Sequence, residues 1–234
     1  MFQQLFDPDS STYTYLLADD ETREAVLIDP VRDQVQRDLA LLHKHGLKLV
    51  AVVDTHVHAD HVTAAASLKT ATGASTAVGL DCQAAAYDRG LVDGDLIAFG
   101  RHRLQVIATP GHTPGSMSYL WQDGDTARVF TGDALLIGGC GRTDFQGGSS
   151  AQQWDSITRR LFTLPPATEV WPGHDYRGRT HSSIGAEREG NPRFVGQTAE
   201  SFAALMSSLN LPPPRHIDTA VPANKRAGEP IQEA

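Results

Sequence analysis

Cysteine is scarce in this chain, which has only Cys82 and Cys140 among 234 residues. So few thiols exclude a disulfide framework as the organising feature and favour reduced thiols in a cytosolic protein. The chain also lacks any run of basic residues, and its formal net charge is −8. Phosphate binding requires clustered Lys and Arg, so we expect no nucleic-acid partner. No apolar run approaches the length of a membrane span, so we expect no membrane association.

The N-terminal segment Met1–Pro8 has no basic region followed by a long apolar segment, and no Arg- and Ser-rich amphipathic stretch. Neither export nor organelle import is therefore predicted, and we expect a cytoplasmic protein. With 40% hydrophobic and 21% charged residues, the chain can bury a substantial core. We expect one domain spanning residues 1–234.

Short apolar runs alternate with helical patterns along the chain. Strands are predicted at Tyr13–Leu17, Ala25–Ile28, Leu49–Asp54, Ser75–Val78, Leu96–Phe99, Leu104–Thr109, Ser116–Trp121, Arg128–Thr131 and Glu169–Trp171. Helices are predicted from an Asp33 cap to Gly46, over Val62–Thr72, from a Ser149 or Ser150 cap through Leu161, and finally over Thr198–Leu209. This order predicts an α/β fold in which helices cover the sheets. The polar tail from Pro222 is expected to lie on the surface or to fray.

The densest group of metal-capable side chains is Thr55–His61, which holds three histidines and an aspartate directly after the apolar run Leu49–Val53. The apolar run is typical of a buried strand, so the group lies where a strand ends. Imidazole and carboxylate suit zinc, iron or manganese, and no nearby cysteine favours a structural thiolate site. The spacing therefore indicates a metal site rather than ordinary surface histidines.

Three further side chains follow strands in the same way. His112 lies in the loop Thr109–Gly115, which two prolines and two glycines restrict, and Asp133 and His174 each follow an apolar strand and a glycine. A single histidine after a strand is usually a hydrogen-bonded surface or core residue. Four sites of this kind instead indicate a polar cluster at one edge of the sheets.

These motifs together resemble the metallo-β-lactamase superfamily. The resemblance rests on Thr-His-x-His-x-Asp-His, Gly-His-Thr-Pro-Gly, Thr-Gly-Asp and the late Gly-His, in the same order from about Tyr13 to Tyr176. It implies an αββα sandwich of two mixed sheets flanked by helices. Within the superfamily, the segments Gly138–Gln146, His174–Tyr176, Leu211–Pro214 and Ala220–Asn224 resemble the persulfide dioxygenases.

That resemblance implies an enzyme that oxidises glutathione persulfide with O2 and water to sulfite and glutathione, using one non-haem Fe(II) per chain. By resemblance, the metal ligands, and through the metal the catalytic residues, are His56, His112 and Asp133. Such a triad leaves adjacent positions open for substrate sulfur and O2. The residues expected to support it by hydrogen bonds are His58, Asp60, His61, His174, Thr113, Thr131, Cys140 and Asp175. The sequence alone leaves open whether the seven candidate ligands fill two metal sites.

Arg142 and Tyr176 are the predicted substrate-binding residues. The planar guanidinium of Arg142 can bind a carboxylate of an anionic tripeptide through two hydrogen bonds. An alternative is a surface ion pair between Arg142 and Asp144. The resemblance assigns Tyr176 to glutathione contact, whereas a lone tyrosine is more often half-buried packing.

The alternative function is a glyoxalase II type thioester hydrolase, which would use two metals to activate water. The segment Arg142–Phe145 instead follows the dioxygenase form of the loop, and metal content separates the two. A non-enzymatic alternative is a sulfur-responsive binding module that holds a ligand on iron or zinc and leaves O2 untouched. The expected partners are a second copy of the chain in a homodimer and, because no rhodanese-like segment is present, a separate rhodanese-type sulfurtransferase.

Overall fold

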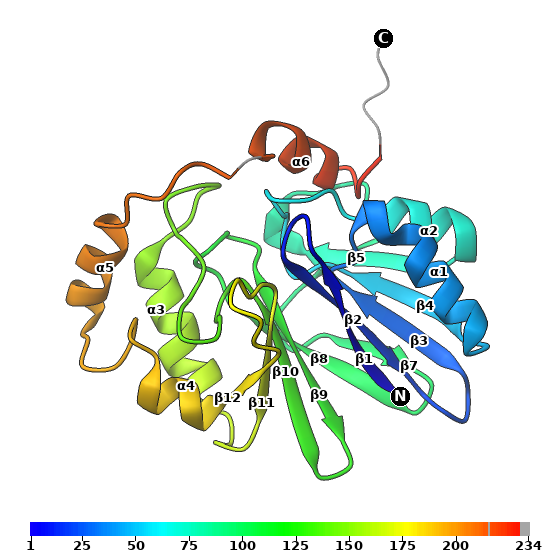
Figure 1. Cartoon of the computed structure of the whole chain (residues 1–234), viewed down its shortest axis with the longest axis horizontal. Helices are drawn as coiled ribbons and strands as arrows, with labels where there is room; N and C mark the ends of the chain where they lie inside the picture. Colours follow the sequence, from blue (N-terminus) through cyan, green and yellow to red (C-terminus); the bar gives the residue numbers. More distant parts are fainter. Residues whose placement is uncertain (215, 230–234) are drawn as a thin grey trace.

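Two six-stranded sheets face each other in the computed structural model, which describes residues 1–214 and 216–229 (Figure 1). The first sheet has the spatial order β1 (Phe2–Asp7), β2 (Thr12–Ala18), β3 (Glu24–Ile28), β4 (Lys48–Val53), β5 (Ser75–Gly79) and β6 (Arg89–Leu91). The second has the order β12 (Ser182–Ser183), β11 (Glu169–Pro172), β10 (Thr126–Gly132), β9 (Met117–Asp123), β8 (His102–Ala108) and β7 (Leu96–Phe99). Both sheets mix parallel and antiparallel pairs.

Helices lie on the outer face of each sheet. They are α1 (Val35–Lys44), α2 (Ala65–Thr72), α3 (Ser150–Arg159), α4 (Ile184–Gly190), α5 (Ala199–Ser207) and α6 (Ile217–Asn224). In Figure 1, α1 and α2 cover the first sheet, α3 to α5 lie beside the second, and α6 lies near one end of both sheets. The predicted αββα sandwich is confirmed. No helix in the described part of the chain is long and apolar enough to cross a membrane.

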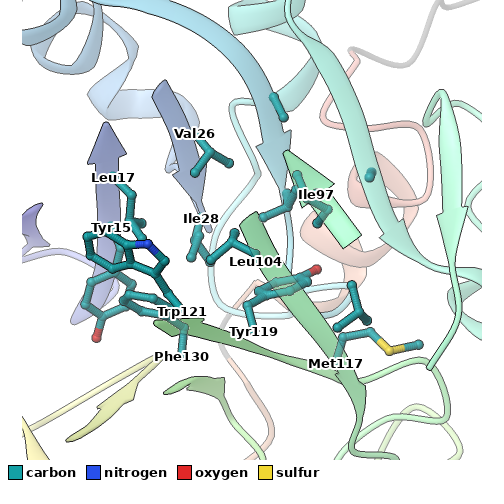
Figure 2. Close-up of a cluster of buried hydrophobic side chains, with 14 of the residues drawn as sticks. Tyr15, Leu17, Val26, Ile28, Ile97, Leu104, Met117, Tyr119, Trp121 and Phe130 are labelled. Atoms are coloured by element: carbon teal, nitrogen blue, oxygen red, sulfur yellow. The ribbon is translucent and has the colours of Figure 1, made fainter. Parts of the chain in front are cut away.

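The central core fills the space between the sheets with large side chains from both inner faces. Tyr15 and Val26 come from the first sheet, and Tyr119, Trp121 and Phe130 come from the second (Figure 2). Each aromatic side chain buries a large apolar area, and burial contributes roughly 25 cal/mol per Å². Two outer cores attach the helices, with Leu42 and Leu68 in the first and Ile157 and Phe202 in the second; the sheets therefore form a rigid base for the loops at their ends.

Several predicted boundaries agree with the structure and several do not. Ser149 caps α3 by accepting a hydrogen bond from the Gln152 amide, as predicted. Asp33, however, lies inside the 3₁₀ turn Arg32–Gln34 instead of capping α1. The helix predicted from Val62 begins only at Ala65.

The predicted helix through Leu161 is also too long, because Leu161 lies in the separate 3₁₀ turn Leu161–Thr163 and not in α3. The tail prediction was wrong as well. α5 is not the final helix, because α6 follows and contains Pro222. Beyond that proline, Ala223, Asn224 and Ala227 are buried.

The strand ends that carry the candidate ligands lie at the same edge of the two sheets. The ends of β4, β10 and β11 are followed by Thr55–His61, Asp133 and His174, and the loop after β8 carries His112. The topology therefore assembles one polar centre from four separate segments.

Candidate metal centre

His56 is oriented by a hydrogen-bond chain that begins at Asp29. Asp29 follows β3 with a positive φ of 50°, and its carboxylate accepts from the Thr55 amide at 2.6 Å and from Thr55 Oγ1 at 2.8 Å. Thr55 Oγ1 also lies 3.0 Å from His56 Nδ1. Because a hydroxyl has one hydrogen, which Thr55 gives to Asp29, His56 Nδ1 must donate to Thr55. The Nε2 lone pair of His56 is thereby left for a metal.

His112 is oriented in the same sense. Its Nδ1 donates to the Arg142 carbonyl at 2.7 Å, and its Nε2 lies 3.7 Å from Asp133 Oδ2. Ligand atoms of His56, His112 and Asp133 all lie within 4.8 Å of one another. Asp133 Oδ1 is buried and has no hydrogen-bond donor among the described residues. Two free imidazole nitrogens and an unpaired carboxylate oxygen fit a divalent metal ion.

The loop that holds these two ligands requires glycine at position 141. The Gly141 amide donates to the Asp133 carbonyl at 2.8 Å. A Cβ at this position would lie 2.3 Å from that carbonyl oxygen and 3.0 Å from His112 Nδ1. The close approach therefore excludes any side chain between the two ligands.

Three of the other candidate ligands form a second group, since ligand atoms of His58, Asp60 and His61 also lie within 4.8 Å of one another. Asp60 Oδ2 accepts from His61 Nδ1 at 2.8 Å and from Thr12 Oγ1 at 3.0 Å. His58 differs from the other histidines, because its Nε2 contacts Asp29 Oδ1 at 3.1 Å.

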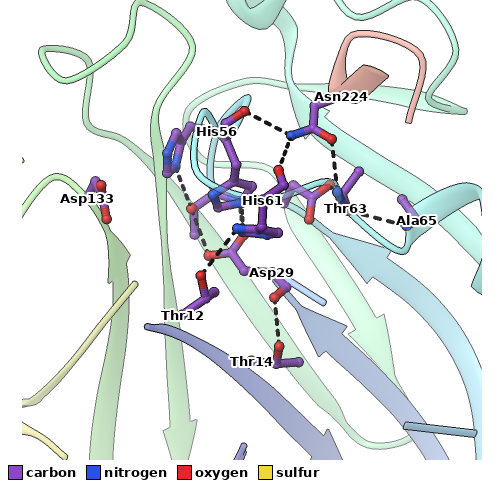
Figure 3. Close-up of polar contacts among 12 residues, drawn as sticks. Thr12, Thr14, Asp29, His56, His61, Thr63, Ala65, Asp133 and Asn224 are labelled. Carbon is purple, nitrogen blue, oxygen red and sulfur yellow. Dashed lines mark hydrogen bonds and ion pairs between the residues drawn. The ribbon is translucent and has the colours of Figure 1, made fainter. Parts of the chain in front are cut away.

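His174 joins this second group to Asp133. Its Nε2 lies 3.5 Å from Asp133 Oδ1 and 3.6 Å from Asp60 Oδ2. Its Nδ1 donates to the Ser11 carbonyl at 3.1 Å, in the turn before β2. The structure thus brings all seven candidate ligands together, as Figure 3 shows for His56, His61 and Asp133.

Burial and neighbouring charges set the protonation of these histidines in the metal-free protein. Burial lowers the pKa of His56 and of His61, so both favour the neutral form that can bind a metal. Burial opposes charge on His58 too, but the carboxylates of Asp29, Asp60 and Asp54 together outweigh it and raise the pKa of His58 to about 10. Asp133 and Asp60 likewise raise the pKa of His174 against the effect of burial. His58 is therefore the site histidine that carries a proton most firmly.

Among the described residues, the hydroxyls of Thr113 and Thr131 form hydrogen bonds with groups other than the ligand side chains. The Thr113 hydroxyl lies 2.8 Å from the Ser116 hydroxyl, and Thr131 Oγ1 donates to the Leu135 carbonyl at 2.6 Å. Each hydroxyl therefore braces a turn next to a ligand. Cys140 lies against Met206, and burial raises the pKa of its thiol to about 12. A thiol held neutral in this way is not an activated nucleophile.

Asp175 organises the loop after His174. Its carboxylate accepts from the amides of Arg177 and Arg179 at 2.8 and 2.7 Å, and from the Arg179 guanidinium at 2.8 and 3.0 Å. Arg179 also donates to the Ile137 carbonyl at 2.7 Å. Asp175 thus joins the His174 loop to the segment that follows Asp133.

Arg142 forms the ion pair considered as its alternative role. Nε and Nη2 donate to the two oxygens of Asp144, both at 2.7 Å. Nη1 donates to the Pro212 carbonyl at 2.6 Å, and Nη2 donates also to the Leu211 carbonyl at 3.2 Å. Four hydrogen bonds therefore engage four of the five N–H groups of the guanidinium and leave one Nη1 hydrogen. Tyr176 is 74% exposed, so it does not form half-buried packing, and its ring stacks on His174 with an interplanar angle of 6°.

Sequence reasoning missed several residues that hold the centre, namely Ser11, Thr12, Asp29 and Asn224. A signal existed for Asp29, because it directly follows an apolar strand, as Asp133 and His174 nearly do. Ser11, Thr12 and Asn224 lie in distant segments with no local pattern, so only the folded chain shows their contacts.

Comparison with known proteins decides the family. The metallo-beta-lactamase superfamily matches residues 7–81 and 82–174. The mitochondrial persulfide dioxygenase ETHE1 of Bos taurus is 47% identical over 228 residues, which cover 97% of this chain and 89% of that protein. The chain belongs to the persulfide dioxygenases of the metallo-β-lactamase superfamily. The crystal structure of ETHE1 from Myxococcus xanthus superposes on the structure of this chain with a TM-score of 0.94 and 53% sequence identity. The match covers 98% of this chain and 100% of that one.

The hydrolase alternative finds less support. The hydroxyacylglutathione hydrolase-like protein of Mus musculus is 38% identical over 168 residues, which cover 70% of this chain and 58% of that protein. The persulfide dioxygenase match is both higher in identity and longer. The family resemblance stated from the sequence motifs is therefore confirmed.

Proposed function

We propose that the protein is an iron(II) persulfide dioxygenase that converts glutathione persulfide, O2 and water into glutathione and sulfite. The observation that carries this proposal is the convergence of His56, His112 and Asp133 within 4.8 Å in a chain of the persulfide dioxygenase family. Iron(II) held by two imidazoles and one carboxylate would supply adjacent open positions for substrate sulfur and O2.

The chain contributes orientation and charge to this reaction. Thr55 and the Arg142 carbonyl hold Nδ1 of His56 and His112, so both Nε2 atoms point to the same position. Asp133 would supply the negative charge to a bound ion, and two imidazoles with one carboxylate would leave its other positions for small molecules. The exposed Tyr176 ring next to His174 is placed to contact the carrier part of the substrate.

One metal ion per chain is favoured by the hydrogen bonds of the second group. Asp60 Oδ2 is already shared by His61 and Thr12, and His58 Nε2 is taken by Asp29. We propose that these side chains orient the centre and do not hold a second ion. Arg142 is proposed to contact a substrate carboxylate, which would use its remaining Nη1 hydrogen or displace Asp144.

A cytoplasmic location, a homodimer and a separate sulfurtransferase partner stay predictions. The family resemblance supports the partners. Size-exclusion chromatography with light scattering tests the dimer directly.

Anaerobic metal analysis combined with oxygen uptake on glutathione persulfide tests the function. We expect one iron per wild-type chain and oxygen uptake with sulfite release. His112→Ala should lose iron and activity together, while His43→Ala, at an exposed site on α1, should keep both. Two zinc ions with thioester hydrolysis, or full activity in iron-free His112→Ala, would contradict the proposal.

A further inference from the structure

The loop of residues 58–63 carries His58, Asp60 and His61 and contains no helix and no named strand. The loop lies between β4 and α2, and its backbone partners near the end are a bridge from Thr63 to Val31 and the Arg32 amide, which donates to the Val62 carbonyl at 2.8 Å. His58, His61 and Thr63 are nevertheless buried. Buried carbonyl and amide groups require hydrogen-bond partners, so another part of the chain must supply them.

Asn224 supplies these partners from the end of α6. Its Nδ2 donates to the His58 carbonyl at 2.9 Å and to the His61 carbonyl at 2.8 Å, and its Oδ1 accepts from the Thr63 amide at 2.9 Å (Figure 3). The side chain is 1% exposed. One amide therefore uses both donor hydrogens and its acceptor to fix three points of a six-residue loop.

The segment after Asn224 docks on the same region. The Ala66 amide donates to the Ala227 carbonyl at 2.9 Å. Gly228, with a φ of 84°, approaches the Thr63 carbonyl so closely that a Cβ would lie 2.1 Å from its oxygen. The C-terminal segment from Asn224 to Gly228 thus packs closely against residues 58–66, and the Asn224 side chain forms three of the hydrogen bonds between them.

We infer that Asn224 is a positioning residue for the metal centre, acting through the backbone of the loop that carries His58, Asp60 and His61. This inference rests on the metal centre of the proposed function and not on its substrate. His56 lies only two residues before the first anchored carbonyl, and His174 contacts Asp60. Release of the loop would therefore disturb a ligand and its hydrogen-bonding neighbours together.

The test is the affinity of the full-length, metal-free protein for Fe(II), measured anaerobically by competition with a chromophoric chelator. Asn224→Asp keeps the shape and the acceptor for Thr63 but turns an oxygen toward two carbonyls. We expect it to weaken iron binding about 10- to 100-fold, the usual effect of losing a residue that supports metal ligands. Asn210→Asp makes the same charge change at an exposed site and should bind iron as the wild type does.

Thermal unfolding of the same metal-free proteins separates positioning from general stability. A purely structural Asn224 would lower the unfolding temperature of Asn224→Asp and leave its iron affinity at the wild-type value, and that result would overturn the inference. If Asn224→Asp does not fold, Asn224→Ser, which adds no charge, carries the same comparison. Because no persulfide is used, a failed dioxygenase assay would leave this result unaffected.

Discussion

Replacing Thr55 by valine should weaken metal binding without creating a cavity. Valine has nearly the shape of threonine, but it removes the hydroxyl that donates to Asp29 at 2.8 Å and accepts from His56 Nδ1 at 3.0 Å. His56 would keep a buried N–H without a partner and would lose the contact that fixes its tautomer. The substitution therefore acts on a metal ligand through a single atom.

The expected size of the effect follows from these two bonds. A buried donor left unsatisfied costs about 1–3 kcal/mol, part of which appears as lower stability. The loss of ligand orientation should weaken iron binding about 10- to 100-fold. At about 1.4 kcal/mol for each factor of ten, the change in binding free energy is about 1.4–2.8 kcal/mol.

The assay compares Thr55→Val with Thr14→Val, because Thr14 also has a buried hydroxyl that bonds to Asp29. Thr14 Oγ1 donates to the Asp29 carbonyl at 2.8 Å and touches no ligand (Figure 3). Both variants should lose stability, but only Thr55→Val should lose iron affinity in anaerobic chelator competition. Thr55→Ser keeps the hydroxyl and should restore affinity. Equal iron affinity in Thr55→Val and Thr14→Val would refute the reasoning.

Three further predictions concern other parts of the chain. Gly132→Ala should lower the unfolding temperature measured by circular dichroism, because φ is 49° and the new Cβ would lie 2.4 Å from Thr55 Oγ1; an unchanged temperature would contradict this. Burial raises the pKa of Asp38 from 3.8 to about 6 against the effect of Arg37. Between these two pH values the folded state therefore binds more protons than the unfolded state. As pH rises through this window, Asp38 lowers the free energy of unfolding by about 3 kcal/mol. Asp38→Asn should remove that part of the pH dependence in urea unfolding at pH 4.5 and 7, and an unaltered difference between the two would argue against it. Arg142→Ala should keep iron, since the carbonyl that accepts from His112 remains, and should raise the KM for persulfide; loss of iron would instead assign Arg142 to holding the loop.

The αββα sandwich and the ligand cluster could be predicted because short, local sequence patterns indicate both. An apolar run followed within a few residues by His or Asp marks a strand end, and the strand ends of β4, β10 and β11 meet at one edge. The pattern is visible within about ten residues of each ligand. Seven candidate ligands were therefore found from sequence, and the structure brings all seven together.

The supporting contacts could not be predicted, since each joins segments far apart in the chain. Asn224 is 161 residues from Thr63, and its surroundings read as a polar tail. Three backbone groups form hydrogen bonds with its side-chain amide inside the protein. A polar composition therefore predicts an exposed residue where the structure has a buried one. The late start of α2 also depends on a distant segment, because the Val62 carbonyl accepts from the Arg32 amide and the Ala64 amide donates to the Pro30 carbonyl, both at 2.8 Å. β1 was missed because Gln3 and Gln4 interrupt its apolar pattern, and its stability comes from pairing with β2.

The number of metal ions that the centre can hold depends on which carboxylates are not already engaged by hydrogen bonds or by a charged neighbour. Asp29 accepts from Thr55 and faces a His58 whose pKa is raised to about 10, so its charge is already compensated. Asp60 accepts from two donors, and burial, which raises its pKa, is outweighed by His61, His174 and His58 together, so the pKa of Asp60 is lowered. Asp133 Oδ1 is buried without a hydrogen-bond donor among the described residues, and His174 Nε2 lies 3.5 Å from it. We propose a single divalent ion on His56, His112 and Asp133, because a second ion would have to compete with the hydrogen bonds that hold Asp29 and Asp60 in place.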